Sequence, residues 1–133
     1  MANAIFYSRW SPHVLSVLRI VIGLLFLEHG TQKILGFPLS PNPPPALLSL
    51  QGLQGAIELV GGLLILVGLF TRPVAFILCG NMAVAYFMAH APKSFYPLLN
   101  GGELAALYSF VFLYFVFAGP GPWSLDATLR KTR

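Results

Sequence analysis

The sequence predicts an all-α integral membrane protein built as a four-helix bundle. Of its 133 residues, 56% are AVILMFWYC and only 9% are Asp, Glu, Lys or Arg, and the mean hydropathy is +0.75. Charged residues make up roughly a quarter of a typical soluble domain, so this chain has too few of them to cover a water-exposed surface. Runs such as LLILVGLF lack the two-residue alternation of barrel strands, which favours helices as the spanning elements.

The same numbers exclude several other classes of protein. The length fits one domain over residues 1–133. The excess of aliphatic and aromatic residues opposes disorder, and the single cysteine, Cys79, excludes a disulfide scaffold. The net charge of +4 requires no nucleic-acid partner, because membrane orientation accounts for it. We therefore expect the lipid bilayer to be the main surroundings of the chain.

The first spanning helix is expected at about residues 14–34. A bilayer core of about 30 Å needs roughly 20 apolar helical residues at about 1.5 Å each. This segment is most apolar from Ile20 to Leu27 and then becomes polar. A cleaved signal peptide does not fit, because charged residues interrupt the apolar stretch and no small-residue cleavage site follows it.

The second and third helices are expected at about residues 53–70 and 73–91. The second reads LQGAIELVGGLLILVGLF and stops at the residues Thr71, Arg72 and Pro73. The third has its proline in the first turn, where the missing N–H costs nothing, and it holds no Asp, Glu, Lys or Arg. The short connection predicts an antiparallel helical hairpin.

The fourth helix is expected at about residues 100–118, and it ends at the breaker sequence GPGP. The connection between the first two helices contains five prolines, which predicts a partly extended excursion at the membrane surface. Four spans put both termini on one side, together with the Arg72 turn. That side carries six basic residues, whereas the opposite side carries two, Lys33 and Lys93. The positive-inside rule therefore predicts that both termini are cytoplasmic.

Polar residues inside the predicted spans are the main functional signal. Ionisable groups are costly in a membrane, so they usually face the bundle interior and have a function there. The predicted topology brings seven polar residues to the outer half of the membrane, as a layer that faces a quinone or a partner: Glu28, His29, Lys33, Glu58, His90, Asn100 and Glu103. Three of these, His29, Glu58 and Glu103, are candidate catalytic residues, although Glu103 at a helix start is also a candidate cap.

A quinone is the candidate ligand of this layer, since its head group needs only one or two hydrogen-bond donors and an apolar tunnel. The aromatic residues of 108–117 suit a quinone tail, and helix four facing lipid explains them equally well. Neither His29 nor His90 has a metal-type partner at i+3 or i+4, so no metal site is expected. Cys79 lies among apolar residues, and a packed, inert thiol is expected.

Arg19 is the one charge expected deep in the inner half. Helical geometry allows the carboxylate of Glu58 to meet either Arg19 or Lys33, and we expect a buried ion pair of Arg19 with Glu58. Such a pair would serve packing alone if it only neutralises the two charges. Gly61 and Gly62 lie next to Glu58 and let another helix approach closely.

Several motifs, in order and spacing, resemble the DoxX family of small bacterial four-helix membrane proteins. They are RIVIGLLFLEHGTQKILGF, GAIELVGGLLILVGLFTRPVAFIL and NGGELAALYSFVFLYFVFAGPGPWSLD, and together they span about residues 19–126. The resemblance implies a bundle in the bacterial cytoplasmic (inner) membrane. Family members include a subunit of a thiosulfate:quinone oxidoreductase and a membrane component of a thiol-redox complex. The family pattern marks Arg19, His29, Lys33, Glu58, Asn100 and Glu103.

Three functional hypotheses follow. The first is an accessory, redox-associated subunit of a larger quinone-linked membrane complex, since spanning uses nearly the whole chain and leaves no soluble domain for cofactors. The second is a self-sufficient quinone-reducing oxidoreductase that acts on a small sulfur compound. The third is a purely structural subunit of a bioenergetic assembly. Expected partners are lipid, other membrane or redox subunits and, through the glycine-lined faces, further copies of the chain.

Overall fold

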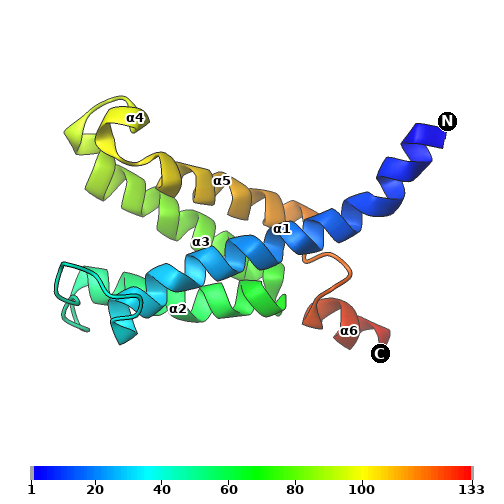
Figure 1. Ribbon diagram of the computed structural model, residues 1–133, viewed down its shortest axis with the longest axis horizontal. Coiled ribbons are helices and arrows are strands. Elements are labelled where there is room, and N and C mark those ends of the chain that lie inside the picture. Colours follow the sequence, from blue (N-terminus) through cyan, green and yellow to red (C-terminus); the bar gives the residue numbers. More distant parts are fainter. Residues whose placement is uncertain (1, 133) are drawn as a thin grey trace.

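The computed structural model describes residues 2–132, and the regular elements of this range are all helical (Figure 1). The prediction of an all-α chain is thereby confirmed. The longer helices are α1 (Ala2–Leu35), α2 (Leu50–Val67), α3 (Thr71–Ala85) and α5 (Glu103–Ala118). The shorter elements are the π-helical η1 (Tyr86–His90), the 3-10 helix η2 (Ala91–Lys93), α4 (Pro97–Asn100) and α6 (Leu125–Lys131).

Three helical stretches within the described residues are long and apolar enough to cross a membrane. They are Ala4–Leu35, Leu50–Val67 and the continuous helical run Thr71–Lys93. The fourth apolar helix, α5, is shorter, with 16 residues. Length and composition therefore support a membrane protein.

The helix bounds differ from the expected ones for identifiable local reasons. α1 starts well before residue 14, because its first turns continue as helix through Pro12. α2 starts at Leu50, where Ser49 caps it by accepting a hydrogen bond from the Gly52 N–H at 3.0 Å. It ends earlier than expected because Gly68 takes the left-handed conformation, with φ of 69°.

The C-terminal half of the chain also differs from expectation. α5 begins at Glu103 rather than near residue 100, because Gly101 has a positive φ of 71° and separates α4 from α5. The sequence reading did not include α6, which follows the GPGP segment. Its N-cap is Ser124, whose hydroxyl accepts from the Ala127 N–H at 3.1 Å.

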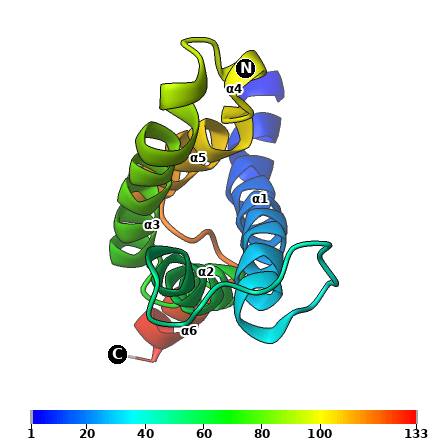
Figure 2. The ribbon, with the colours of Figure 1, turned by 90° about the vertical axis from the view of Figure 1, so that its left-hand side faces the viewer.

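The four longer helices pack as two pairs. α1 lies against α2 and α3 lies against α5, with a smaller contact between α2 and α3. Figure 1 shows the two pairs diverging toward the end of the molecule that carries α4, while the start of α1 and α6 lie at the other end. Seen end-on, the four helices surround a common centre (Figure 2).

Glycines allow the close packing of α1 on α2. A Cβ at Gly23 would lie 2.6 Å from the backbone nitrogen of Leu66, and one at Gly62 would lie 2.8 Å from the Cα of Leu27. Contacts this short leave no room for a side chain, so the two backbones approach each other directly. The close approach predicted at Gly62 is confirmed.

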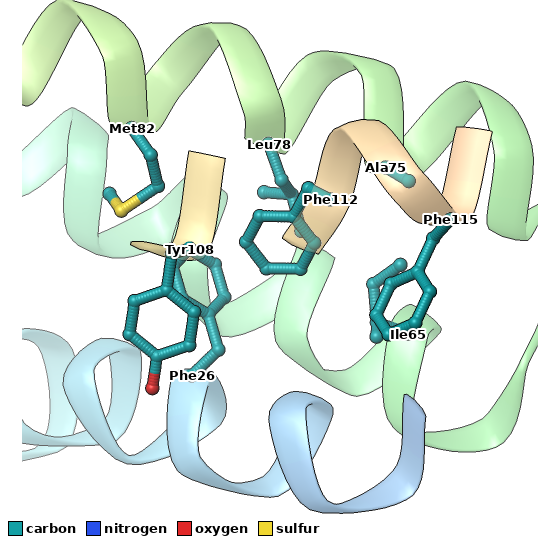
Figure 3. Packing of buried hydrophobic residues seen from close by; sticks show 8 residues of the cluster. All are labelled: Phe26, Ile65, Ala75, Leu78, Met82, Tyr108, Phe112 and Phe115. Carbon is teal, nitrogen blue, oxygen red and sulfur yellow. The ribbon is translucent and has the colours of Figure 1, made fainter. Parts of the chain in front are cut away.

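An apolar core fills the centre between the pairs (Figure 3). Its buried members are Phe26, Ile65, Ala75, Leu78, Met82, Tyr108, Phe112 and Phe115. The rings of Phe26 and Phe112 meet edge to face, with centroids 4.9 Å apart. By contrast, Phe110 and Phe117 on the outer face of α5 are 71% and 75% exposed. The aromatic run of α5 therefore supplies both core and outer surface.

Arg19 joins α1 to the end of α2 and to the segment before α6. Its guanidinium is fully buried and donates only to backbone carbonyls: those of Ile65 at 2.7 Å, Leu66 at 2.5 Å, Pro120 at 2.8 Å and Trp123. The last carbonyls of a helix have no partner within it, so a cation placed there satisfies them and complements the helix dipole. The expected ion pair of Arg19 with Glu58 is therefore wrong.

Two further side chains tie the same end of the bundle together. The carboxylate of Asp126 accepts from the N–H groups of Phe70 at 2.8 Å and Thr71 at 2.9 Å, and so caps the start of α3. The Nη1 of Arg72 donates to the last carbonyls of α5, those of Val116 at 2.7 Å and Phe117 at 2.5 Å. The C-terminal motif GPGPWSLD therefore has a structural role: the Pro120 and Trp123 carbonyls bind Arg19, and Asp126 caps α3. We call this set of contacts the clamp.

Candidate functional site

A cavity of about 280 Å³ lies between the two helix pairs, toward the end where they diverge. Both pairs and the turn after α4 supply its walls. The lining residues are Phe26, His29, Lys33, Gln54, Glu58, Met82, Ala85, Ala89, His90, Gly101, Leu104, Ala105 and Tyr108. Four of the seven residues in the predicted polar layer therefore share one cavity: His29, Lys33, Glu58 and His90.

A buried ion pair forms one wall. The Nζ of Lys33 lies 2.9 Å from Oε1 and 2.8 Å from Oε2 of Glu58, whose side chain is 3% exposed. The contact to Oε2 is poorly directed, which leaves this oxygen without a hydrogen bond among the described residues. Glu58 is the ninth residue of α2, about 12 Å along its axis from Leu50, so it lies mid-helix rather than near the outer start.

The depth of each residue explains why Lys33, and not Arg19, pairs with Glu58. The backbone of α2 passes Gly30 at Leu59 and Gly23 at Leu66, so the two helices run antiparallel with a defined register. Arg19 lies 14 residues before Lys33 on α1, about 21 Å away along the helix axis, at the level where α2 ends. The sequence reading kept Lys33 as the other candidate partner, and the structure selects it.

Two further polar groups of the lining, one on α1 and one on α5, have no hydrogen-bond partner among the described residues. The ring nitrogens of His29 and the hydroxyl of Tyr108 make no hydrogen bond within residues 2–132, and the two rings are perpendicular with centroids 6.1 Å apart. Figure 3 shows the Tyr108 hydroxyl pointing toward α1, away from the stack that its ring forms on Phe112. These groups are free to bond to a ligand in the cavity.

The π-helical turn η1 brings His90 into the cavity wall. Its Nδ1 lies 3.1 Å from the carbonyl oxygen of Asn100. A carbonyl only accepts, so Nδ1 is the donor and, in the neutral ring, Nε2 is an acceptor. π-Turns are frequent at functional sites, and this one adds a hydrogen-bond acceptor to the cavity.

Asn100 is buried but shapes the loop rather than the cavity. Its Nδ2 donates to the Tyr86 hydroxyl at 3.2 Å and to the Ser94 carbonyl at 3.0 Å. Its Oδ1 accepts from the N–H of Gly102 at 2.7 Å. Asn100 therefore holds the segment that positions His90.

The remaining predicted residues lie elsewhere. Glu28 and Glu103 are exposed and do not line the cavity. The predicted polar layer lacks two lining residues with hydrogen-bonding side chains. They are Gln54, which lies one turn before Glu58 on the same helix face, and Tyr108, which was expected only as part of an aromatic site for a quinone tail. The i, i+4 spacing is the signal that would have identified Gln54.

Cys79 packs at the edge of the core between α3 and α5, where its carbonyl accepts from the Ser109 hydroxyl at 3.0 Å. Among the described residues, no group of three or more His, Cys, Asp or Glu side chains is placed to hold a metal ion. The site offers hydrogen-bonding groups next to an aromatic floor, which is formed by the rings of Phe26 and Tyr108.

Comparison with known proteins identifies the family. The DoxX family model matches residues 14–91, more than half of the chain. An uncharacterized protein of Haemophilus influenzae is 47% identical over 132 residues, covering 92% of this chain and 96% of that protein. An uncharacterized membrane protein of Mycobacterium tuberculosis is 30% identical over 139 residues, covering 90% and 83%. No solved structure matches the chain significantly. With its motifs, its apolar helices and these relatives, the chain belongs to the DoxX family of membrane proteins.

Proposed function

We propose that this DoxX protein is an accessory, redox-associated subunit of a larger quinone-linked membrane complex, and that its cavity binds the quinone head group. The observation that carries the proposal is the cavity itself: buried charged and polar groups with unused hydrogen-bonding capacity meet an aromatic floor there. In a membrane such groups are retained mainly where they serve a site.

The residues present fit a quinone head group in both size and chemistry. Ligand cavities commonly measure roughly 300–1,000 Å³, so about 280 Å³ suits a single ring rather than a whole lipid. Lys33 and the Tyr108 hydroxyl can donate to quinone carbonyl oxygens, while Oε2 of Glu58 and Nε2 of His90 can accept from quinol hydroxyls. Leu104 at the rim is 49% exposed, so a tail can leave toward lipid.

A bound quinone supplies two-electron redox chemistry, and the residues of the chain orient it and handle protons. Glu58 lies beside Lys33, and its Oε2 is free to accept a hydrogen bond from a hydroxyl of the bound group. In the proposed complex a partner subunit holds the carrier that exchanges electrons with this quinone.

The proposal includes a topology of four spanning helices with both termini in the cytoplasm of a bacterial inner membrane. Support comes from the basic residues at the α6 end, which include Arg9, Arg72, Arg130 and Lys131. Fusion of a cytoplasmic reporter and a periplasmic reporter to the C-terminus tests it. Activity of the periplasmic reporter there would reverse the proposed orientation.

The decisive experiment is purification from the native membrane in mild detergent, followed by mass spectrometry of co-purifying chains and extraction of bound quinone. We expect a stoichiometric redox assembly that carries quinone, with the quinone lost in Glu58→Gln and His29→Ala. Glu103→Gln is the matched control, since it removes the same charge outside the cavity. Equal quinone content in all variants would refute the site.

Other outcomes of the same experiment separate the alternatives. A lone or self-associated bundle that carries quinone would favour a self-sufficient oxidoreductase. A purely structural role is favoured by one observation, the tight packing of α1 on α2 around the Lys33–Glu58 pair. That role predicts that Glu58→Gln impairs assembly, whereas an assembled complex without electron transfer would exclude it.

A further inference from the structure

A second hollowed region lies at the opposite end of the bundle from the cavity. It consists of two adjoining depressions of about 380 and 520 Å³, which share the residues Arg72, Pro120 and Arg130. Parts of α1, α3, α5 and α6 form their walls. Neither guanidinium takes part in the ion pair of the cavity or in the proposed quinone site.

Both guanidinium groups keep unused donors directed at this region. The Nη1 of Arg72 donates to the last carbonyls of α5, and the Nε of Arg130 donates one long hydrogen bond to the Asp126 carbonyl at 3.4 Å. Their other N–H groups have no acceptor within residues 2–132. The carboxylate of Asp126 lies in the first depression, but it accepts from two backbone N–H groups and forms no salt bridge with either arginine. Two cations against one engaged carboxylate leave the region positive.

Neutral groups complete the lining. The hydroxyl of Thr71 is fully buried in the wall of the first depression and has no hydrogen-bond partner among the described residues. Ser11 and Tyr114 bring further hydroxyls to the second depression, and these make no side-chain hydrogen bond among the described residues. The same depression is also lined by an apolar strip, which consists of Pro12, Leu15, Ala118 and Pro122. A polar, cationic head region thus adjoins an apolar strip, which suits an amphiphilic anion.

The setting points to lipid. Leu129 lines the first depression and is exposed, and the exposed Trp123 follows Pro122 of the second depression. Tryptophan is enriched at the membrane–water interface. Guanidinium groups bind phosphate with two parallel hydrogen bonds, and basic residues next to spanning helices attract anionic lipids. We propose that Arg72 and Arg130 hold the phosphate of an anionic phospholipid, with its acyl chains along the apolar strip beside Leu15.

The proposal predicts that the lipid stabilises the clamp, since it would contact α1, α3, α5 and α6 together. The purified full chain is titrated in mild detergent with phosphatidylglycerol, with phosphatidylcholine of the same acyl chains, and with inorganic phosphate. Lipid adducts are counted by native mass spectrometry, and Tm is followed. Phosphatidylglycerol is expected to form a stoichiometric adduct and raise Tm, while the other two compounds are not.

The variant Arg130→Gln is expected to weaken phosphatidylglycerol binding at least about tenfold, from the loss of charged hydrogen bonds. Lys131→Gln removes the same charge from the same helix outside both depressions, and it should bind like the wild type. Should Arg130→Gln fail to fold, Arg130→Lys keeps the charge without the planar fork and is expected to bind more weakly than the wild type. The proposal would be overturned if Arg130→Gln and Lys131→Gln lost phosphatidylglycerol binding equally, or if Arg130→Lys bound it like the wild type. It would also be overturned if phosphatidylcholine or inorganic phosphate bound as well as phosphatidylglycerol.

Discussion

Replacing Arg19 by methionine tests the clamp that closes one end of the bundle. Methionine retains much of the apolar stem but none of the donors, so four backbone carbonyls lose the guanidinium as a partner: those of Ile65, Leu66, Pro120 and Trp123. The Ile65 carbonyl still accepts from the N–H of Gly68 at 3.1 Å. Because the site is fully buried, water cannot readily replace the guanidinium. The last turn of α2 and the segment before α6 are expected to separate from α1.

The magnitude follows from the number and kind of these hydrogen bonds. A hydrogen bond within a membrane protein contributes about 0.6 kcal/mol on average, and a charged donor in a soluble protein contributes about 1.5 kcal/mol or more. Four bonds to Arg19 together therefore contribute about 2–6 kcal/mol. The desolvation cost of the buried charge, which the methionine no longer carries, moves the expected loss toward the lower end.

The assay is reversible unfolding in detergent, with limited proteolysis at residues 119–132 as a local readout. Arg9→Met is the control, since Arg9 is exposed on the same helix and its side chain has no hydrogen bond within the described residues. We expect Arg19→Met to lose about 2 kcal/mol or more and to be cleaved faster, with Arg9→Met unchanged. If both variants kept wild-type stability and cleavage, the carbonyl contacts would contribute nothing and the reasoning would be wrong.

Two further predictions concern the packing of the helices. Asp126→Asn is expected to lower the free energy of unfolding by about 1–2 kcal/mol, because the charged cap of α3 is lost. Glu28→Gln, at an exposed position, is the control and should leave stability unchanged. Thermal unfolding compares the two variants, and equal stability would contradict the capping role. Gly62→Ala is expected to lower stability by about 1–3 kcal/mol, because its Cβ would lie 2.8 Å from the Cα of Leu27. Gly80→Ala, with open space around it, should be neutral or stabilising by up to about 1 kcal/mol, and the reverse order of the two variants would show that the helices do not approach as described.

Composition and local pattern sufficed to predict the helices and the polar residues of the site. Apolar length and the turn residues locate most bounds of the four longer helices to within a few residues, because both signals are local in the chain. The exceptions are the start of α1 and the end of α3, where a π-helical turn follows Ala85, and the short helices α4 and α6 were not predicted. The cost of polar groups in lipid likewise marks Lys33, Glu58 and His90 without any knowledge of their neighbours.

The partners of these residues depend on contacts between helices, which local spacing does not encode. Glu58 meets Lys33 rather than Arg19 because glycine contacts set the antiparallel register of α1 on α2, and that register carries Arg19 to the end of α2. In the same way the rotation of α5 against the other helices turns Tyr108 into the cavity and leaves Glu103 outside it. A helix repeats its faces every 3.6 residues wherever it packs, so its sequence shows which residues share a face, while depth and rotation against its neighbours arise from packing in three dimensions.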